Sequence, residues 1–488
     1  MRDVADDLQA RTRSLNEVEL NTDADYVMVW LQQNIRGHEH PAIEVAIELA
    51  NAIGVPVLVY HGMRYDYPYA SNRLTRFLVG ASHAMGQRLA ERGVTCRQLV
   101  QRGREHGKGM VYRLAERAAC VIVDDHPTFV ARAQSDSFAA AKTCACLAVD
   151  STRLVPQSQL QGRLGTTRAF RTAHTALREE WTHSCGNREP AVRDEVTGLP
   201  DELVVLADMS EKQLDGIVAD LPMDQALPYT DDHPATAAEV AARVAAVDEE
   251  FVRDYKSART NPTREHGATE LSPYLHFGMV SPWEVVMQIQ ASGAPKSAQY
   301  KLLDELLTWR EWSHWRMCEK PQLLFYETLP TFARETFAAH KDDPREELLP
   351  VEDVIHGRTG DPVFDASQRF WLKTGWLHNN LRMYWAKQVM RLTPSAEVAW
   401  ATCCYMNDRM SYDGRDPATY ISMRWAFGES RPGYREIPIY GRVMPKSSGP
   451  ILKRPGMKDW VAEWSTVDVP SVECPNFVKR AELYGVEV

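Results

Sequence analysis

Two segments decide how this chain is interpreted: TGWLHNNLRMYWAKQ at 374–388 and YMNDRMSYDGRDP at 405–417. No Pro occurs in the first, and no Gly after Gly375, so the pattern predicts a helix. At 100° per residue, its side chains form two faces, each of which mixes large apolar residues with polar ones. One face has Trp376, Asn379, Asn380 and Met383, and the other has His378, Arg382, Trp385 and Val389. A helix buried on both sides, with polar groups that need partners, is therefore expected. An ordinary core helix filled by Trp and Met is the simpler alternative.

The second segment concentrates charge among apolar residues. Ten positions hold Asn407, Asp408, Arg409, Asp413, Arg415 and Asp416. Such density is typical of either a solvated loop or a buried network whose charges are all paired. The local sequence alone leaves both interpretations open.

Length and charge set the outer limits. A chain of 488 residues corresponds to about three domain-sized units and can bury a large core. Its net charge of −10 argues against a protein that coats nucleic acid indiscriminately, while allowing a local basic patch.

Cysteine usage and the N-terminus indicate a compartment. The nine cysteines are scattered without metal-ligand spacing, as expected for reduced cysteines in a cytoplasmic protein, and we expect no metal site. The acidic start MRDVADDLQARTRS has no apolar core, so no signal peptide is expected. No apolar run approaches the roughly 18 residues that would predict a membrane span.

The first 155 residues alternate between two kinds of segment. Short β-branched runs are separated by helical stretches such as Pro41–Ile53 and Ser71–Glu91; the runs are Tyr26–Leu31, Val55–Tyr60, Ala118–Val123 and Cys144–Val149. This alternation predicts a doubly wound parallel sheet of Rossmann-like type, with a ligand crevice at the carboxyl ends of its strands. Gly103–Gly109 resembles a phosphate loop only superficially, because its glycines are too close and no Ser or Thr follows Lys108.

The remaining sequence divides into two parts. Residues 156–236 are irregular and are interpreted as an interdomain connection with some helix, and residues 237–488 as a helical domain with a C-terminal extension. An amphipathic helix is expected from Ala237 to about Arg259. In ATELSPYLHFG (268–278), Thr269, Ser272 and Pro273 form a good helix N-terminus, which suits a phosphate group, although a plain Ser cap is the simpler reading.

The helix LLDELLTWREWSHWR (302–316) carries a second unusual face. At helical spacing, one side holds Glu305, Trp309, Trp312 and Arg316. Indoles can stack on nucleobases, and a carboxyl group sheltered beside them can hydrogen-bond a base edge. A half-buried packing surface with a Glu at its rim is an equal alternative.

These motifs together resemble the photolyase/cryptochrome family. The G-W-x-H-N-x-x-R-M helix, the N-D-x-x-x-x-D-G-R-D-P segment, the element around Ser272 and the E-L-x-x-W-R-E helix cover most of residues 250–445, and the resemblance extends more weakly to the first 150. MYWAK and the form of the second segment are most similar to the class II cyclobutane pyrimidine dimer photolyases. The resemblance implies an α/β domain followed by an all-α domain that binds FAD.

The resemblance also implies roles for individual residues. FAD would be bound by Tyr255, Thr269, Leu271, Ser272, Arg382, Asn407 and Asp413, and the DNA lesion by Glu305, Trp309, Asn379, Met383 and Trp425. Glu305, Asn407 and Met383 are the catalytic candidates. Asn407 would accept a hydrogen bond from flavin N5 without adding negative charge, and Glu305 would act on the damaged pyrimidines.

The implied activity is light-driven repair of UV-damaged DNA by a monomeric enzyme, a deoxyribodipyrimidine photolyase. A blue-light photoreceptor of the cryptochrome kind and a light-independent FAD protein that binds DNA are the alternatives. Glu305, Trp309, Met383 and Trp425 together favour repair, and Met383 disfavours the (6-4) photolyases, which have His there.

Two features depart from the family pattern. Trp385 matches one of three aromatic electron-transfer positions of the class II branch. The other two positions are occupied by Phe364 and Leu392. Other aromatic residues nearby in sequence could take over this role or could be core residues: Trp371, Trp376, Tyr384 and Trp400. In the α/β domain, where many members hold an antenna chromophore of deazaflavin or folate type, the usual basic-acidic motif reads Gln32-Gln33-Asn34-Ile35-Arg36. A second chromophore therefore stays open. The tail with Lys446, Lys453, Arg454 and Lys458 is either a DNA-contacting stretch or a solvated extension.

Overall fold

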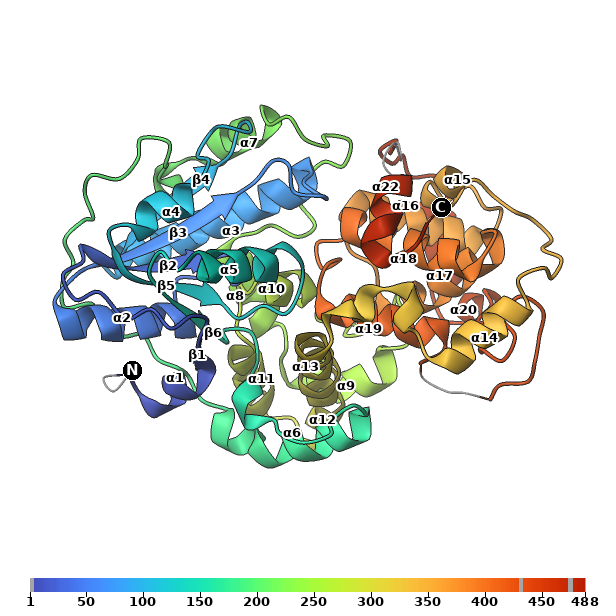
Figure 1. Cartoon of the computed structure of the whole chain (residues 1–488). Coiled ribbons are helices and arrows are strands. Elements are labelled where there is room, and N and C mark those ends of the chain that lie inside the picture. Colours follow the sequence, from blue (N-terminus) through green and yellow to red (C-terminus); the bar gives the residue numbers. More distant parts are fainter. Residues whose placement is uncertain (1–3, 430–432, 473–476, 488) are drawn as a thin grey trace.

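The computed structural model describes residues 4–429, 433–472 and 477–487. Figure 1 shows a sheet with its flanking helices at the N-terminal end of the chain and a helical part formed by the C-terminal half. The fold class expected from the sequence, a mostly parallel α/β region followed by a helical one, is confirmed.

The six strands have the order β1-β6-β5-β2-β3-β4, and only the pairing of β1 with β6 is antiparallel. Their bounds are β1 Thr12–Ser14, β2 Tyr26–Leu31, β3 Val57–Met63, β4 Thr95–Val100, β5 Ala118–Asp124 and β6 Ala145–Val149. Strands β2 and β5 are buried along their whole length, as expected for central strands covered on both faces.

Four of these strands follow the predicted runs, but β1 and β4 were missed. β4 reads TCRQLV and β1 only TRS, so neither has the continuous apolar run of a central strand. Both lie at the edges of the sheet, where one neighbour suffices and polar side chains are tolerated.

The sheet is connected and covered by helices α1 Asp6–Arg11, α2 Pro41–Ile53, α3 Asn72–Glu91, α4 Met110–Ala115 and α5 Phe129–Ala141. The irregular connection contains α6 Thr167–Trp181 and α7 Glu211–Ala219, with 3-10 turns η1 Gln157–Gln159 and η2 Leu206–Asp208. In Figure 1, α6 lies beneath α11, α12 and α13, away from the sheet.

The helical part begins with α8 Ala237–Ala245, α9 Glu249–Ala258, α10 Ser272–His276, α11 Pro282–Ala291, α12 Lys296–Leu303, the π-helical η3 Asp304–Arg310 and α13 Glu311–Glu319. It continues with η4 Pro321–Leu324, η5 Tyr326–Thr328, α14 Thr331–Ala339, α15 Val351–Ile355, α16 Pro362–Thr374, α17 Asn379–Leu392 and α18 Ala396–Met410. Last come α19 Pro417–Arg424, the π-helical η6 Trp425–Glu429, α20 Gly449–Leu452, α21 Met457–Trp464, α22 Phe477–Ala481 and η7 Glu482–Tyr484.

Three of the helix predictions need correction. The helix expected from Ala237 breaks before α9, because the side chain of Asp248 caps a new helix by accepting from Phe251 N. The helix expected over 374–388 begins only at Asn379, since Gly375 ends α16 in the left-handed conformation and His378 caps α17. Asn407 lies on α18 rather than in a loop.

Arg73 ties the α/β part to the helical part. This fully buried side chain of α3 donates to the backbone oxygens of Met410 (3.0 Å), Leu372 (2.5 Å) and Pro228 (3.1 Å). It therefore binds the last turns of α16 and α18. Within the described residues, no helix is long and apolar enough to cross a membrane.

Candidate functional site

A cavity of about 600 Å³ opens among the helices of the C-terminal half. Its walls come from α9, α10, η3, α17, α18 and α19. The resemblance gave thirteen residues a role in binding FAD or the lesion, in catalysis or in electron transfer, and twelve of them line this cavity: Tyr255, Thr269, Leu271, Ser272, Glu305, Trp309, Asn379, Arg382, Met383, Asn407, Asp413 and Trp425. Residues up to 170 positions apart along the chain thus meet in one place.

A buried ion pair forms one part of the wall. Arg382 Nη2 lies 2.7 Å from Asp413 Oδ1, and Arg382 Nε donates to Leu377 O. Burial opposes the charge of Asp413, but Arg382 together with the hydroxyls of Ser272 and Ser411 outweighs it and lowers the pKa of that carboxyl. The 405–417 segment is therefore buried rather than a solvated loop, but its charges are not all paired, because Arg415 Nη1 has no hydrogen-bond partner among the described residues.

Asn407 presents an unused acceptor. Its amide nitrogen donates to Cys403 O at 2.8 Å, as i,i−4 spacing on α18 allows. Its fully buried Oδ1 has no hydrogen-bond partner among the described residues. Since buried acceptors are rarely left unpaired, this oxygen indicates a donor on a bound group.

The short helix α10 brings the predicted phosphate element to the same cavity. Ser272 is its first residue rather than its cap, and Ser272 Oγ accepts from Trp376 Nε1 at 3.1 Å. Thr269 Oγ1 accepts from Leu271 N at 3.3 Å. Glu270, between them, has a φ of 51°, a strained value, and its carboxylate pairs with Arg243 at 2.9 Å and lies 3.2 Å from His233 Nε2.

At the mouth, Glu305 is held by two cations. Arg259 Nη2 and Lys301 Nζ each lie 2.5 Å from Glu305 Oε1. All three side chains are about a quarter exposed, so the cluster faces both the cavity and solvent. In the sequence, Arg259 stands four residues after Tyr255, and Glu305 stands four residues after Lys301. This helical spacing could have indicated the cluster, but neither cation was predicted to pair with Glu305.

Two indoles face each other beside this carboxylate. The rings of Trp309 and Trp425 meet edge to face, with centroids 4.9 Å apart and planes at 85°. They come from the two π-helical segments, η3 and η6. Their edge-to-face packing leaves flat apolar surface at the cavity wall.

The π-helical segment changes which residues share that face. Trp312, expected beside Glu305 and Trp309, still meets Trp309 edge to face with centroids 6.1 Å apart, but it does not line the cavity, and its Nε1 donates to Leu164 O at 3.1 Å. Ser313 lines the cavity in its place. The face was derived at 100° per residue, a value that does not hold through the wider turns of η3.

A carboxylate that was not singled out sits between two histidines. Asp416 Oδ2 is 3.2 Å from His276 Nδ1, and Asp416 Oδ1 is 3.5 Å from His314 Nε2, too long for a well-aligned hydrogen bond. Although burial opposes its charge, the histidines hold the pKa of Asp416 well below its ordinary value. The segments HFG at 276–278 and RDP at 415–417 contain His276 and Asp416, and they could have pointed to this contact.

Trp385 is the predicted residue that does not line the cavity. It is buried, stacks on Phe364 with centroids 6.1 Å apart, and lies 5.2 Å from Trp371. Trp371 in turn lies under the Arg382 guanidinium at 5.5 Å. Its electron-transfer role stays a prediction.

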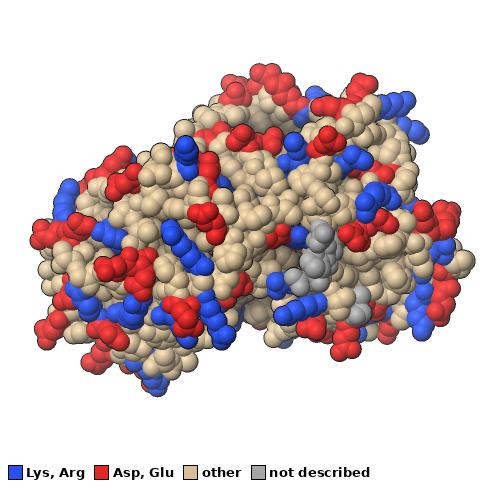
Figure 2. Space-filling model, turned by 90° about the horizontal axis from the view of Figure 1, so that it is seen from above, with Lys and Arg blue, Asp and Glu red and all other residues tan. Residues whose placement is uncertain are grey.

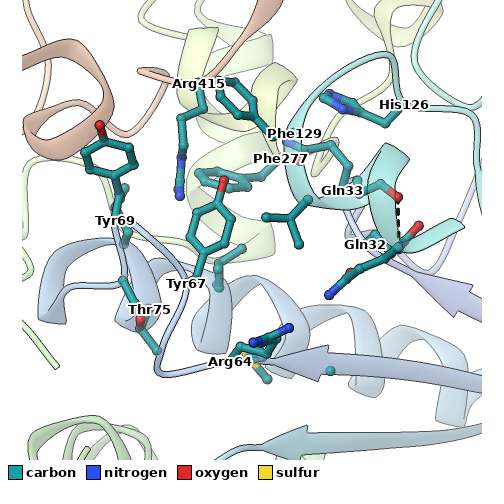
Figure 3. A pocket seen from close by; sticks show the side chains of 18 of the residues that line it. Gln32, Gln33, Arg64, Tyr67, Tyr69, Thr75, His126, Phe129, Phe277 and Arg415 are labelled. Carbon is teal, nitrogen blue, oxygen red and sulfur yellow. Dashed lines mark hydrogen bonds between the residues drawn. The ribbon is translucent and has the colours of Figure 1, made fainter. Parts of the chain in front are cut away.

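A second, smaller cavity of about 120 Å³ lies where the carboxyl ends of β2, β3 and β5 meet the helical part. Gln32, Gln33, Arg64, Tyr67 and His126 line it, and Figure 3 shows Arg415 reaching toward Tyr67 from the helical side. The Arg415 guanidinium lies 4.5 Å from the Tyr67 ring, and its buried Nη1 has no partner among the described residues.

Within the described part of the chain, no group of three His, Cys, Asp or Glu residues has the geometry of a metal site. The eight cysteines it contains are all free thiols.

Comparison with known proteins identifies the helical part. Residues 302–483 match the family model described as the FAD binding domain of DNA photolyase. The deoxyribodipyrimidine photo-lyase of Methanothermobacter thermautotrophicus is 28% identical over 444 residues, 89% of this chain and 93% of that protein. The rice enzyme of the same name is 33% identical over 198 residues, which is only 38% of its length.

Solved structures extend the likeness to the whole fold. A class III photolyase from Agrobacterium tumefaciens superposes with a TM-score of 0.62 at 16% identity, covering 95% of this chain and 97% of its own. An archaeal photolyase from Sulfolobus tokodaii, described with two FAD molecules, gives a TM-score of 0.59 at 15% identity and 94% coverage of each chain.

The fold and cavity therefore define a protein with an α/β part and a helical flavin-binding part. Its residues 302–483 are similar to the FAD binding domain of DNA photolyase, and its fold as a whole is similar to that of solved photolyases. FAD is its cofactor, and the cavity fits that group: it offers an unpaired buried acceptor at Asn407, a buried cation at Arg382 and hydroxyls at Thr269 and Ser272.

Proposed function

We propose that this protein repairs UV-damaged DNA in light as a deoxyribodipyrimidine photo-lyase that splits cyclobutane pyrimidine dimers. Relatives that carry this name include one that the chain matches over 93% of its length. When bound, light-excited reduced FAD supplies one electron to the dimer and recovers it after the ring has split, so the reaction has no net redox change.

One observation carries the proposal. The residues expected to bind FAD (the flavin set: Tyr255, Thr269, Leu271, Ser272, Arg382, Asn407 and Asp413) and those expected to bind the pyrimidine dimer (the dimer set: Glu305, Trp309, Asn379, Met383 and Trp425) line the same cavity. Arg382, Asn407 and Asp413 form one part of its wall, while Glu305, Trp309 and Trp425 form another. A pyrimidine dimer flipped out of the duplex could therefore lie next to the flavin, with no protein wall between the two groups.

Each side chain has a distinct task in this proposal. Arg382 would offset negative charge on the flavin, and Asn407 Oδ1 would accept a hydrogen bond from it without adding charge. Trp309 and Trp425 provide apolar surface for the pyrimidines, with Asn379 and Met383 beside them. Glu305, positioned by Arg259 and Lys301, hydrogen-bonds the dimer and stabilises its radical anion.

The direct test uses an oligonucleotide with a single thymine dimer and the purified, FAD-containing protein. Restoration of intact thymines under blue light but not in the dark, followed by chromatography, is expected. Equal conversion in both conditions, or none in either with reduced FAD bound, would contradict the proposal.

Finer assignments also belong to this proposal. We infer a class II enzyme from MYWAK and the Asp413–Pro417 segment, a monomer, and a location in the cytoplasm. The domain division at 155/156 and 236/237 is likewise proposed, with residues 237–488 as the catalytic domain.

A cryptochrome-like photoreceptor is the second candidate. It would share the FAD site and need no dimer pocket, and the clustering of Glu305, Trp309 and Trp425 at the mouth favours repair. A light-independent FAD protein would show no change of the flavin spectrum under blue light, which separates it from both.

A second chromophore in the smaller cavity is an independent part of the proposal. Arg415 and Arg64 would favour an anionic group, and Tyr67 and Phe129 a planar one. An absorption spectrum of the purified protein that shows a band beyond those of one bound FAD would support it.

A further inference from the structure

Lys387 is a buried cation that neither the flavin set nor the dimer set uses. It lies on α17, one turn after Met383, and is only 6% exposed. Its ammonium donates to the backbone oxygen of Ala426. No carboxylate lies within ion-pair distance of it among the described residues, so the stem and charge are buried against one carbonyl group.

That carbonyl belongs to the turn that carries Trp425. The π-helical segment η6 starts at Trp425 and is kinked at Phe427 and Gly428, where φ of Gly428 is 104°. At the far end of the turn, Glu429 is paired with Arg424 and Arg316. The turn is thus fixed from two directions, by Glu429 at its end and by Lys387 next to Trp425.

Trp425 itself depends on this support. Its indole is half-buried and meets Trp309 edge to face. An indole that is only partly buried can tilt if its backbone shifts. The Ala426 carbonyl belongs to the residue that follows Trp425, so a bond to it restrains the backbone next to the ring.

We propose that Lys387 is a positioning residue: by holding the Ala426 carbonyl it sets the place of the Trp425 indole, and thereby the discrimination between dimer-containing and intact DNA. The inference about DNA rests on the proposed function; the inference about Trp425 does not.

The groups that face Lys387 make the contact sensitive to pH. Cys403 of α18 and Lys446 of the tail are the titratable neighbours, and Tyr440 donates its hydroxyl to the Lys387 backbone oxygen. Burial, reinforced by the Lys446 charge and opposed by Cys403, lowers the pKa of Lys387 to about 7. A neutral amine donates more weakly than an ammonium, so the hold on Ala426 should weaken as pH rises through neutrality.

The first test follows Trp425 without DNA. The FAD-containing protein is labelled with 5-fluorotryptophan, and its ¹⁹F resonance for Trp425 is assigned by its loss in Trp425→Phe. We expect this resonance to titrate between pH 6 and 9 in the wild type and to be shifted and insensitive to pH in Lys387→Met. Lys212→Met, which removes an exposed lysine of α7, should leave the wild-type titration unchanged.

The second test measures binding to duplexes with and without a thymine dimer. Lys387→Met should weaken binding to the dimer-containing duplex about tenfold and leave binding to the intact duplex unchanged. In the wild type the ratio of the two affinities should fall as pH rises through about 7.

The outcomes separate the two levels of inference. A wild type that does not discriminate the dimer contradicts the proposed function, whereas a wild type that discriminates while Lys387→Met behaves identically overturns the role of Lys387. If Lys387→Met does not fold, the wild-type ¹⁹F titration decides alone, and a Trp425 resonance constant from pH 6 to 9 overturns the proposal.

Discussion

At the scale of single residues, Glu305 combines two properties that a pocket carboxylate needs. It is partly exposed at the cavity mouth, and Arg259 and Lys301 fix its direction. Glu305→Ala should fold and retain FAD, because its contacts are at the rim. The repair yield per absorbed photon should fall about tenfold, as expected when a hydrogen bond of about 1.4 kcal/mol to the reacting group is lost.

The measurement is the quantum yield of repair on dimer-containing DNA at saturating DNA concentration. Glu305→Gln is the matched control, since it keeps size and one acceptor while losing the charge that pairs with Arg259 and Lys301. An unchanged yield in Glu305→Ala would remove this residue from the reacting site.

Asn407 is the second residue whose chemistry depends on charge. A carboxylate at this position would repel an anionic reduced flavin, and this repulsion costs far more in a buried cavity than in water, where it is only about 1 kcal/mol at 4 Å. Asn407→Asp should therefore keep FAD but change which flavin redox states accumulate during illumination. Absorption spectra recorded through a photoreduction series test this.

Two further variants serve as controls for Asn407→Asp. Tyr255→Phe and Ser272→Ala should weaken FAD retention and leave the redox behaviour of the remaining flavin unchanged. If Asn407→Asp followed the wild type through every redox state, Asn407 would not lie at N5.

At the scale of elements, sequence patterns predicted the strongly periodic pieces. Tyr26–Leu31 and Pro41–Ile53 have the predicted bounds, because a central apolar strand and a Pro-started amphipathic helix carry their own signals. Motif resemblance gathered twelve residues that line one cavity.

The missed features depend on tertiary contacts. The π-helical turns of η3 place Ser313 rather than Trp312 at the cavity wall, and no local residue type signals these turns. Lys301 lies four residues before Glu305, so that pair could be read from spacing, but the Arg259–Glu305 pair and the His276–Asp416–His314 cluster join separate segments whose meeting cannot be. Such pairings follow from packing, which overrides local propensity.

Asp408 connects three elements and yields a pH prediction. Its buried carboxyl accepts from Tyr420 of α19 and Tyr484 of η7, and burial raises its pKa to about 7. The folded protein therefore keeps this proton between about pH 4 and 7, whereas the unfolded chain loses it. The stability that Asp408 contributes is full below pH 4 and is lost as pH rises through about 7.

Asp408→Asn removes this dependence. The free energy of unfolding of Asp408→Asn relative to the wild type should rise by up to about 1.4 kcal/mol per pH unit between pH 4 and 7. Urea unfolding of both proteins at several pH values measures it. A constant difference over this range would show that the pKa of Asp408 is not raised.

At the scale of the whole molecule, Arg73 holds the α/β part against the FAD-binding part. Arg73→Met would leave three buried backbone oxygens without their donor, and each such acceptor costs about 1–3 kcal/mol. We expect a loss of about 3 kcal/mol or more in stability. FAD retention should weaken as well, because Met410 is only three residues before Asp413.

Arg88→Met on the same helix is the matched control. Arg88 pairs with Glu91 at 2.7 Å on the exposed side of α3, and surface pairs contribute about 0–1 kcal/mol. Similar losses of stability in the two variants would contradict the role of Arg73 as the link between the two parts.

The net charge of −10 opposes binding to DNA, which is itself a polyanion. Figure 2 shows acidic and basic side chains interspersed over the face seen from above, without a large surface of one sign. Two tail cations are already engaged, since Lys446 and Arg454 both donate to Asn380 at the start of α17. These two cations are therefore less available to phosphates, and with the negative net charge we expect affinity for intact duplex to be low.

The dimer should supply the rest of the affinity through the cavity. Each phosphate contact adds about −0.9 to the slope of log K against log salt, and this slope should be the same for intact and dimer-containing duplexes because the backbone contacts are shared. Their affinity ratio should therefore be large and independent of salt, as measured by fluorescence anisotropy from 50 to about 200 mM salt. A ratio near one would favour the photoreceptor, and a ratio that vanished as salt rose would mean that discrimination comes from phosphate contacts rather than from the pocket of Glu305, Trp309 and Trp425.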